Sequence, residues 1–342
     1  MSTTLKEIAQ RTGLSIPTVH QVLNGYNVRF SAETRKKVLE AAKELDYRPN
    51  IAARGLRARK SFLLGLQFNA VNYPLIAGFT RGFQQMCTAQ SYAPIFLTHV
   101  STEDEAENCR TLIDRRVDGL IVNCAVGTTG ASNAGRFAEM RQAGTHLVEV
   151  FGRFVDGAPR VTLDYRAGAV ASTELLIAKG HKKIALFTHS DYRTSERIPG
   201  LYWTAWEHWR GYEETMRQAG LEPTTIAYQV SGDRTREGAH YFSAYENAKL
   251  LLNHPAKPTA AVFYRGEAVE AILHYASANP SAAPEGFGIS VFDRVAPTHS
   301  DAISLYALPQ PIEDVGQAAA KLLLDSIAGR EVESIAMGPK KP

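Results

Sequence analysis

The side chains that most often act as nucleophiles or metal ligands are sparse and poorly spaced for catalysis in this chain. The cysteines, Cys87, Cys109 and Cys124, are odd in number and form no C-x-x-C pair, which argues against a disulfide framework and a zinc site. The histidines show no H-E-x-x-H or H-x-x-H spacing, and no phosphate-binding loop or nucleophile elbow is present. These observations disfavour an enzyme, and we expect neither a metal ion nor a cofactor.

Three tryptophans at a spacing of three residues form another pattern with chemical potential. Trp203, Trp206 and Trp209 could offer flat faces on which a ligand stacks. The same spacing arises when one side of a helix packs into a protein core, which is the more common outcome. The sequence alone leaves both interpretations open.

The distribution of charge separates a small basic head from a larger, mildly acidic body. The first 60 residues contain 12 Lys and Arg against 5 Asp and Glu, a net charge of +7, whereas the other 282 residues carry −4. A basic module of this kind is typical of nucleic-acid binding, because neutralising phosphates releases counterions. The chain shows no secretory signal, and its apolar runs are shorter than the roughly 20 residues that cross a bilayer. We therefore expect a cytoplasmic protein without a membrane partner.

Three short helices are predicted within this head. Thr4 and Glu7 have the T-x-x-E spacing of a capping box at the start of the first helix, which Gly13 ends. Ser15 can cap a second helix, and Ser31 can start a third. Three helices that share one small core, with a glycine-containing turn between the first two, indicate a helix-turn-helix, although a generic three-helix bundle gives the same pattern. The exposed side of the second helix is expected to carry Ile16, Pro17, His20 and Gln21.

The head resembles a known family of transcription regulators. Residues 4–24, T-L-K-E-I-A-Q-R-T-G-L-S-I-P-T-V-H-Q-V-L-N, look like the helix-turn-helix of the LacI/GalR family. The resemblance continues through residues 31–35, S-A-E-T-R, and through residues 47–57, Y-R-P-N-I-A-A-R-G-L-R, which are similar to the hinge segment of the family. Shorter stretches, such as D-R-R-V-D-G-L-I at 114–121, carry the likeness into the body.

The resemblance implies that the second helix lies in the major groove of DNA, where Ile16, Pro17 and Gln21 face base edges. Glutamine can bond bidentately to adenine, whereas Ile and Pro offer only apolar contacts, for instance to a thymine methyl. Many family members have Ser in place of His20 and Arg in place of Gln21, so we expect an unfamiliar operator sequence. Several positions of the head match residues that contact DNA in the family, some of them at the phosphate backbone of the DNA. They are Thr4, Ser15, Ile16, Pro17, Thr18, His20, Gln21, Asn24 and Thr34.

The hinge segment, residues 50–58, is expected to be a short helix that forms only on DNA, because isolated helices of fewer than about 12 residues are marginal. By resemblance, two such helices from a dimer enter the minor groove, and Leu56 from each wedges between base pairs and bends the duplex. A leucine packed in a linker is the structural alternative for Leu56. The hinge residues that match DNA-contacting positions are Asn50, Ala53, Arg54, Leu56 and Arg57, with the arginines on phosphates.

From Phe62 onward, short apolar runs alternate with amphipathic helices, which predicts an α/β fold with parallel sheets. The runs are F-L-L-G-L-Q-F, A-P-I-F-L, D-G-L-I-V-N, H-L-V-E-V, K-I-A-L-F, A-A-V-F and G-I-S-V-F. They predict two lobes, about 61–161 with 293–325 and 162–292 with 326–342. This layout is similar to periplasmic sugar-binding proteins, to which the sensor domain of the family is related. The expected domains are thus a helix-turn-helix head at 1–49, a hinge helix and linker at 50–60, and an effector-binding and dimerisation domain at 61–342.

Ligands of such two-lobed folds bind in the cleft, where polar side chains follow the ends of strands. The family often has Asn-Asp where this chain has Arg265-Gly266, Arg where it has His208, and Asp-Arg where it has Gly152-Arg153. Two carboxylates are thus missing while two arginines remain, which favours an anionic effector such as a sugar acid or a sugar phosphate; a neutral sugar stays an open alternative. By matching position, the candidate effector-binding residues are Asn72, Tyr73, Arg153, Asp164, His208, Arg265 and Asp293.

Together these features predict a sequence-specific DNA-binding regulator, most commonly a repressor in this family. We expect a homodimer that binds double-stranded, pseudo-palindromic operator DNA and whose operator affinity depends on a sugar or sugar derivative. The alternative from another class is an α/β enzyme fused to a DNA-binding head.

Overall fold

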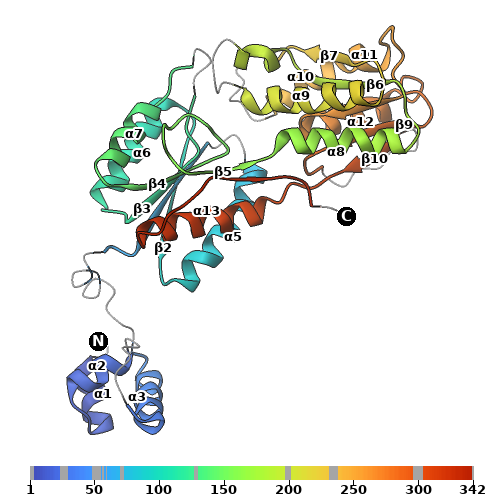
Figure 1. Cartoon of the computed structure of the whole chain (residues 1–342). Helices are drawn as coiled ribbons and strands as arrows, with labels where there is room; N and C mark the ends of the chain where they lie inside the picture. The colour runs from blue at the N-terminus through green and yellow to red at the C-terminus, as the bar shows by residue number, and fades with distance from the viewer. Residues whose placement is uncertain are drawn as a thin grey trace. The chain divides into compact units, whose positions relative to one another are not determined.

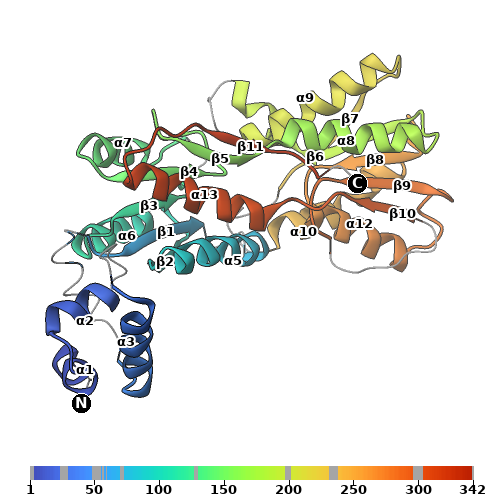
Figure 2. The ribbon, with the colours of Figure 1, turned by 60° about the horizontal axis from the view of Figure 1, so that its bottom comes forward.

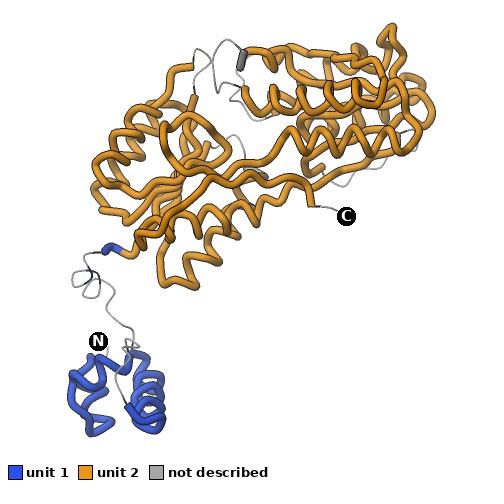
Figure 3. Tube along the Cα trace, in the orientation of Figure 1, with its two compact units in different colours: residues 1–61 blue, residues 62–342 orange. Residues whose placement is uncertain are grey.

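In the computed structural model, residues 1–61 and residues 62–342 form two separate compact units (Figure 3). The structure describes residues 4–23, 30–47, 55, 58, 60–69, 73–126, 130–196, 202–230, 238–295 and 303–340. Seven predicted site residues therefore lie outside the described residues: Asn24, Asn50, Ala53, Arg54, Leu56, Arg57 and Asn72.

The first unit contains the three predicted helices. The capping box is formed, since the Thr4 backbone N–H donates to Glu7 Oε2 at 2.7 Å and the Glu7 N–H donates to Thr4 Oγ1 at 3.4 Å. Ile8, Val19 and Val38, one from each helix, are fully buried and form the centre of the core. The helices are α1 (Leu5–Thr12), α2 (Ile16–Leu23) and α3 (Ala32–Glu44) (Figure 1).

The second unit contains two parallel sheets. The first has the strand order β11-β5-β4-β3-β1-β2 and the second the order β10-β9-β8-β6-β7. The strands of the first sheet are β1 (Leu63–Asn69), β2 (Ala93–His99), β3 (Gly119–Val122), β4 (His146–Val150), β5 (Arg160–Leu163) and β11 (Ile335–Met337). The strands of the second sheet are β6 (Ile184–His189), β7 (Thr224–Tyr228), β8 (Ala260–Phe263), β9 (Phe287–Val291) and β10 (Ile303–Ala307).

Helices cover both faces of each sheet (Figure 2). The first sheet is covered by α5 (Tyr73–Ala89) and α13 (Ile312–Ile327) on one face, and by α6 (Thr102–Asp114) and α7 (Ala134–Gln142) on the other. In the second, α8 (Tyr165–Ala178) and α9 (Trp203–Gln218) cover the face opposite to α10 (Ala239–Glu246), α11 (Ala248–Leu252) and α12 (Gly266–Ala278), and the 3-10 helix η2 spans Ser190–Glu196. Each lobe therefore has three layers, α/β/α, as expected for parallel sheets whose strands are buried on both faces.

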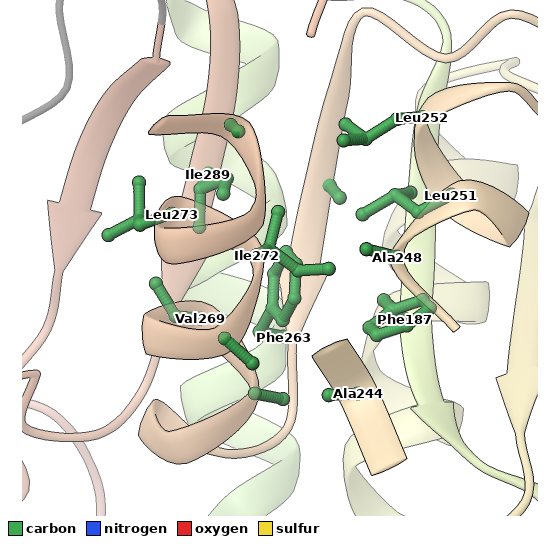
Figure 4. Close-up of a cluster of buried hydrophobic side chains, with 14 of the residues drawn as sticks. Phe187, Ala244, Ala248, Leu251, Leu252, Phe263, Val269, Ile272, Leu273 and Ile289 are labelled. Carbon is green, nitrogen blue, oxygen red and sulfur yellow. The ribbon is translucent and has the colours of Figure 1, made fainter. Parts of the chain in front are cut away.

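The largest apolar cluster lies in the second lobe, between its sheet and the layer of α10, α11 and α12 (Figure 4). Phe187 and Phe263 from neighbouring strands meet with ring centroids 5.4 Å apart, and Ile272 of α12 packs against them. These residues are fully buried, and each such side chain stabilises the fold by roughly 1.5–3 kcal/mol relative to an exposed one.

Helices α5 and α13 pack against each other with their backbones in close contact, although more than 200 residues separate them (Figure 1). A Cβ atom at Gly82 would lie 2.0 Å from the carbonyl oxygen of Glu313, and one at Gly316 would lie 2.1 Å from that of Phe79. Only glycine permits this approach. The pair of glycines thus fixes the late helix α13 to the first lobe.

The predicted path of the C-terminal segment is wrong in two places. Residues 293–325 were expected in the first lobe, yet β10 (Ile303–Ala307) pairs with β9 in the second sheet, and only α13 lies on the first. Residues 326–342 were expected in the second lobe, yet β11 (Ile335–Met337) pairs with β5 in the first sheet. Because the edge strands β10 and β11 are short and partly exposed, their apolar pattern does not indicate which sheet they join.

Among the described residues, no helix has the length and apolar character needed to cross a membrane, and no group of three or more His, Cys, Asp and Glu side chains could hold a metal ion.

Candidate functional site

The helix α2 presents a mixed apolar and polar face away from the core of the first unit. Val19 and Val22 are buried, whereas Ile16 is 44% exposed and Pro17 is also exposed. His20 and Gln21, one turn later on the same face, are half-buried. The arrangement matches the recognition helix of a helix-turn-helix, in which residues of the first turn and of the next turn face the same groove.

Hydroxyl side chains fix the start of α2 and the start of α3. The Thr18 backbone N–H donates to Ser15 Oγ at 3.3 Å, and the two hydroxyl oxygens are 2.8 Å apart. The same arrangement occurs at α3, where the Thr34 N–H donates to Ser31 Oγ at 3.1 Å. Ser15, Thr18 and Thr34, which are predicted to contact the DNA phosphate backbone, thus lie at helix N-termini. Helix N-termini favour anions such as phosphate.

The second unit contains a cavity of about 530 Å³ between its two sheets. Its wall follows the carboxyl ends of strands from both lobes, where ligands of open α/β sheets bind. The volume falls within the usual range for small-molecule sites, ~300–1,000 Å³. The lining residues are Phe68, Leu75, Gly78, Asn123, Phe151, Tyr165, Thr204, Tyr264, Arg265, Glu267, Glu270, Asp293, Arg294, Val295, Gln310 and Ile312.

Arg265, at the N-cap of α12, is the most unusual polar group of this wall. Its Nε atom is buried and has no hydrogen-bond partner within the described protein, and its guanidinium carbon lies 5.3 Å from the centroid of the Tyr264 ring. A buried donor without a partner costs roughly 1–3 kcal/mol. A ligand that accepts a hydrogen bond from Arg265 would remove that cost.

Asp293, directly after β9, connects the start of α12 to this wall. Its Oδ2 accepts the Gly266 N–H at 2.9 Å, and its Oδ1 accepts the Arg294 N–H at 2.8 Å. Burial raises the pKa of the Asp293 carboxyl above its ordinary value, and the two backbone donors partly offset that shift. The carboxylate is thus held by the backbone, and no ion pair between Asp293 and Arg265 is formed.

Aromatic rings form the other part of the wall. The Tyr165 ring meets that of Trp203 edge-on, with centroids 5.9 Å apart, and lies 6.0 Å from the ring of Tyr264. The Tyr264 hydroxyl forms a short hydrogen bond with Thr204 Oγ1. Burial raises the pKa of Tyr165 well above its ordinary value, so this ring is neutral. Rings with one polar end suit a sugar-like ligand, which has both apolar faces and hydroxyl groups.

The structure brings together only some of the residues predicted for this site. Arg265 and Asp293 line the cavity, whereas Arg153, Asp164 and His208 do not. The Arg153 guanidinium lies over Trp203, 4.1 Å from its ring centroid, and Asp164 caps α8 by accepting the Ala167 N–H at 2.8 Å.

His208 lies inside α9, only 1% exposed, with both ring nitrogens unpartnered in the described structure. Burial lowers the pKa of His208 to about 3, so its ring is neutral at physiological pH. The position at which the family resemblance predicts an arginine thus holds an uncharged ring, packed 5.6 Å from that of Tyr264. Tyr73 begins α5, and its side chain lies outside the described part.

Several wall residues escaped the sequence analysis, including Tyr165, Glu270, Arg294 and Gln310. Tyr165 directly follows the predicted Asp164, and Arg294 directly follows the predicted Asp293, so the neighbours of each strand end were the available signal. Gln310 lies on the connection to α13 and donates to the Phe292 carbonyl at 2.8 Å. Its position depends on the crossing between lobes, which the sequence pattern assigned incorrectly.

The tryptophan pattern is explained by packing. Trp206 and Trp209 stack on each other with centroids 4.6 Å apart, and Trp209 packs against the second sheet. None of the three tryptophans lines the cavity, and Trp203 supports it from behind Tyr165.

Two family descriptions match separate parts of the chain. Residues 4–50 match the bacterial regulatory proteins of the lacI family, and residues 173–336 match the periplasmic binding protein-like domain. The first match includes α1, α2 and α3, and the second runs from within α8 to β11, so that it includes the whole second sheet and also α13 of the first lobe.

Curated relatives and a solved structure extend the likeness over nearly the whole chain. Catabolite control protein A of Priestia megaterium is 27% identical over 336 residues, which is 98% of this chain and 95% of the relative. The ribose operon repressor of Escherichia coli K12 is 27% identical over 328 residues, 95% of this chain and 93% of the relative. A lac repressor dimer bound to operator and the anti-inducer ONPF has the same fold, with a TM-score of 0.70 at 20% identity over 99% of this chain and 97% of that one. With its helix-turn-helix head and its two-lobed periplasmic-binding-protein-like body, the chain belongs to the LacI family of DNA-binding transcriptional regulators.

Proposed function

We propose that this protein is a homodimeric repressor whose operator affinity is controlled by a sugar derivative with an anionic group, bound in the 530 Å³ cavity. The observation that carries the effector part of this proposal is the buried, unpartnered Nε of Arg265 in the cavity wall. Arginine binds carboxylate and phosphate through parallel hydrogen bonds, so an anionic oxygen is the ligand group that it fits best.

The remaining wall fits the sugar part of such a ligand. Glu267 and Glu270, one turn apart on α12, offer acceptors for hydroxyl groups, and the Tyr165 and Tyr264 rings offer apolar faces. Two of the relatives described above have names that refer to catabolite control and to the ribose operon. A carbohydrate-derived effector is consistent with both names.

The DNA part of the proposal rests on the exposed face of α2 and on the hinge sequence. Ile16, Pro17 and Gln21 would face the bases, with Gln21 bonding to an adenine. The residues Ser15, Thr18 and Thr34 would bond phosphates and so fix the position of the helix in the groove. Ligand binding would change the relative position of the two lobes, and through the hinge it would change operator affinity.

The edge strand β2 supports the expected homodimer. It pairs only with β1 in the described structure, and Phe96 on this strand is 40% exposed. Ile76, Thr80 and Arg81 of α5 line a concave surface of about 430 Å³ beside Phe96. An exposed apolar edge of this kind is ordinarily covered by a partner, and a second copy of the chain would cover it symmetrically.

The buried thiols argue against a cysteine-dependent enzyme fused to a DNA-binding head. Burial raises the pKa of Cys87 to about 12 and that of Cys109 to about 11, so both stay protonated and unreactive. All three cysteines are free and buried.

A two-step experiment tests the proposal. Selection of duplexes from a random pool by the full-length protein identifies an operator, and a thermal-shift screen of sugars, sugar acids and sugar phosphates identifies a ligand. We expect the ligand to be anionic and to change operator affinity about 5- to 150-fold, the usual range of allosteric coupling. If a bound ligand leaves operator affinity unchanged, the regulatory part of the proposal is wrong. Recovery of no enriched duplex would contradict its DNA part.

A further inference from the structure

A second cavity, of about 620 Å³, lies on the first lobe at the opposite edge of its sheet from the interlobe cavity. Strand β4 connects the two sites, since His146 at its start lines the second cavity and Phe151, directly after its end, lines the interlobe one. A strand of this length separates its ends by about 13 Å at ~3.3 Å per residue. The second cavity is therefore a separate site on the N-terminal edge of the sheet.

Two arginines line this cavity, and neither is paired with a carboxylate of the cavity wall. The Arg160 Nε is buried without a hydrogen-bond partner in the described structure, and neither Arg160 nor Arg141 forms an ion pair there. Gly157, with a φ of +64°, makes room for the second arginine, because a Cβ atom at that position would lie 2.3 Å from Arg141 Nη2. Glu149 lies opposite Arg160 in the register of β4 and β5 and interacts with it electrostatically, but its carboxylate accepts the Phe154 and Val155 N–H groups, and no carboxylate lines the cavity itself.

The other polar side chains of the wall can donate hydrogen bonds to a ligand. The Nδ1 of His146 lies 2.9 Å from Ser326 Oγ, which leaves Nε2 of that ring for a ligand. Ser334 Oγ accepts the Arg160 backbone N–H at 3.1 Å, so its own hydroxyl hydrogen can point to a ligand. Thr145 adds a third hydroxyl, and none of the lining residues is Asp or Glu. Two arginines, a histidine and three hydroxyl groups are the side chains that bind phosphate oxygens.

We propose that this cavity binds a phosphate group, with Arg160 and Arg141 as its charged ligands. It is independent of the effector proposed for the interlobe cavity. Such a phosphate could belong to a free phosphorylated metabolite or to the backbone of DNA, since the linker from the DNA-binding unit joins β1 at the same N-terminal edge of the sheet. In both cases, binding of a phosphate to the first lobe would be coupled to DNA binding by the protein.

The direct test uses inorganic phosphate and the full-length protein at constant ionic strength, with chloride as the reference anion. Isothermal titration calorimetry and thermal shift should show saturable binding of phosphate that Arg160→Gln weakens at least about ten-fold, the loss expected for a charge-assisted hydrogen bond. Arg141→Gln should weaken it in the same direction. Arg110→Gln, at an exposed position of α6, is the matched control and should leave the affinity unchanged.

A further variant separates this proposal from the proposed effector site. Arg265→Gln in the interlobe cavity should leave phosphate binding unchanged. If Arg265→Gln abolishes phosphate binding while Arg160→Gln does not, the anion binds between the lobes and the second site is refuted. Equal phosphate affinity of the wild type, Arg160→Gln and Arg141→Gln would refute it as well, and would mean that Arg141 serves only the carbonyl end of α7.

The source of the phosphate follows from DNA titrations of the same variants. If the DNA backbone occupies the site, Arg160→Gln lowers the affinity for a non-operator duplex and reduces the slope of log K against log salt by about one. If a free metabolite occupies it, the affinity of Arg160→Gln for that duplex equals that of the wild type, while phosphate binding remains impaired.

Discussion

Replacement of Arg265 by glutamine separates an anionic effector from a neutral one. The guanidinium lines the interlobe cavity with its Nε unpartnered, so its charge is available to a ligand. A hydrogen bond to a charged group contributes roughly 1.5–3 kcal/mol, which corresponds to about a 10- to 150-fold change in affinity. Glutamine keeps one donor and much of the side-chain length but removes the charge.

The measurement compares matched ligands on both proteins. A sugar acid and its neutral parent sugar, or a sugar phosphate and its parent sugar, are titrated by calorimetry into the wild type and into Arg265→Gln. We expect the anionic ligand to lose about 10- to 150-fold in affinity and the neutral parent to change by less than about five-fold. A change of equal size for both members of a pair would refute the role of the Arg265 charge.

The same variant also tests a prediction about the stability of the ligand-free protein. Because the Nε of Arg265 is buried without a partner, its removal leaves no hydrogen bond unmade. The free energy of unfolding of Arg265→Gln should therefore equal that of the wild type or exceed it by up to about 1 kcal/mol. A loss of more than that amount on chemical denaturation would show that the arginine is a structural residue and not a ligand-binding one.

Three further predictions concern the DNA-binding head and the buried histidine. Gln21→Ala should lower affinity for the selected operator by about 1–3 kcal/mol and relax specificity at one base pair, with non-operator affinity unchanged, as measured by fluorescence anisotropy. Leu56→Ala should reduce operator affinity and bending, as seen by gel mobility of circularly permuted sites, while effector affinity stays constant; unchanged bending would reject the wedge role. The buried His208 should destabilise the protein in acid: its pKa is lowered to about 3 from 6.5, so the unfolded chain binds the proton first. Stability that is complete above pH 6.5 should thus fall by up to roughly 1.4 kcal/mol for each pH unit between pH 6.5 and about 3. His208→Leu should reduce that slope, whereas an identical slope would mean that His208 does not titrate in this way.

The head was predictable because its signals are local. The capping box of Thr4 and Glu7 and the cap formed by Ser15 depend on residues three positions apart, so the sequence contains the whole interaction. The apolar stripe of Val38, Ala41 and Ala42 likewise follows the period of a single helix. These elements form as predicted.

The strands of the body were predictable where the chain forms a compact apolar run, and such runs include the partly exposed edge strand β2 as well as central strands. The continuous apolar runs of β3 and β8 have the composition of central parallel strands. The edge strands β10 and β11 lack that signal, and the sheet that each one joins depends on contacts made after the chain has crossed between lobes. The packing of α13 on α5 through Gly82 and Gly316 is such a contact, and the residues around each glycine in the sequence do not predict it.

The residues of the proposed effector site differ in the same way. Arg265 and Asp293 directly follow predicted strands, so their presence at the cavity could be expected from the topology of a parallel sheet. Arg153 and His208 have side chains that could bind a ligand. The Arg153 guanidinium lies over Trp203 instead, and His208 is buried in α9. Competition between a ligand and a neighbouring side chain depends on tertiary packing, which a sequence pattern does not contain.

The central claim, that a small-molecule site controls DNA recognition by the head, is tested most directly by one titration series. A selected operator and a scrambled duplex of equal length are titrated with the full-length protein, with and without the identified ligand. We predict that the operator binds at least about 10³-fold more tightly than the scrambled duplex and that the ligand changes the operator affinity but not the scrambled one. Equal affinity for both duplexes, whether or not the ligand is present, would contradict the claim.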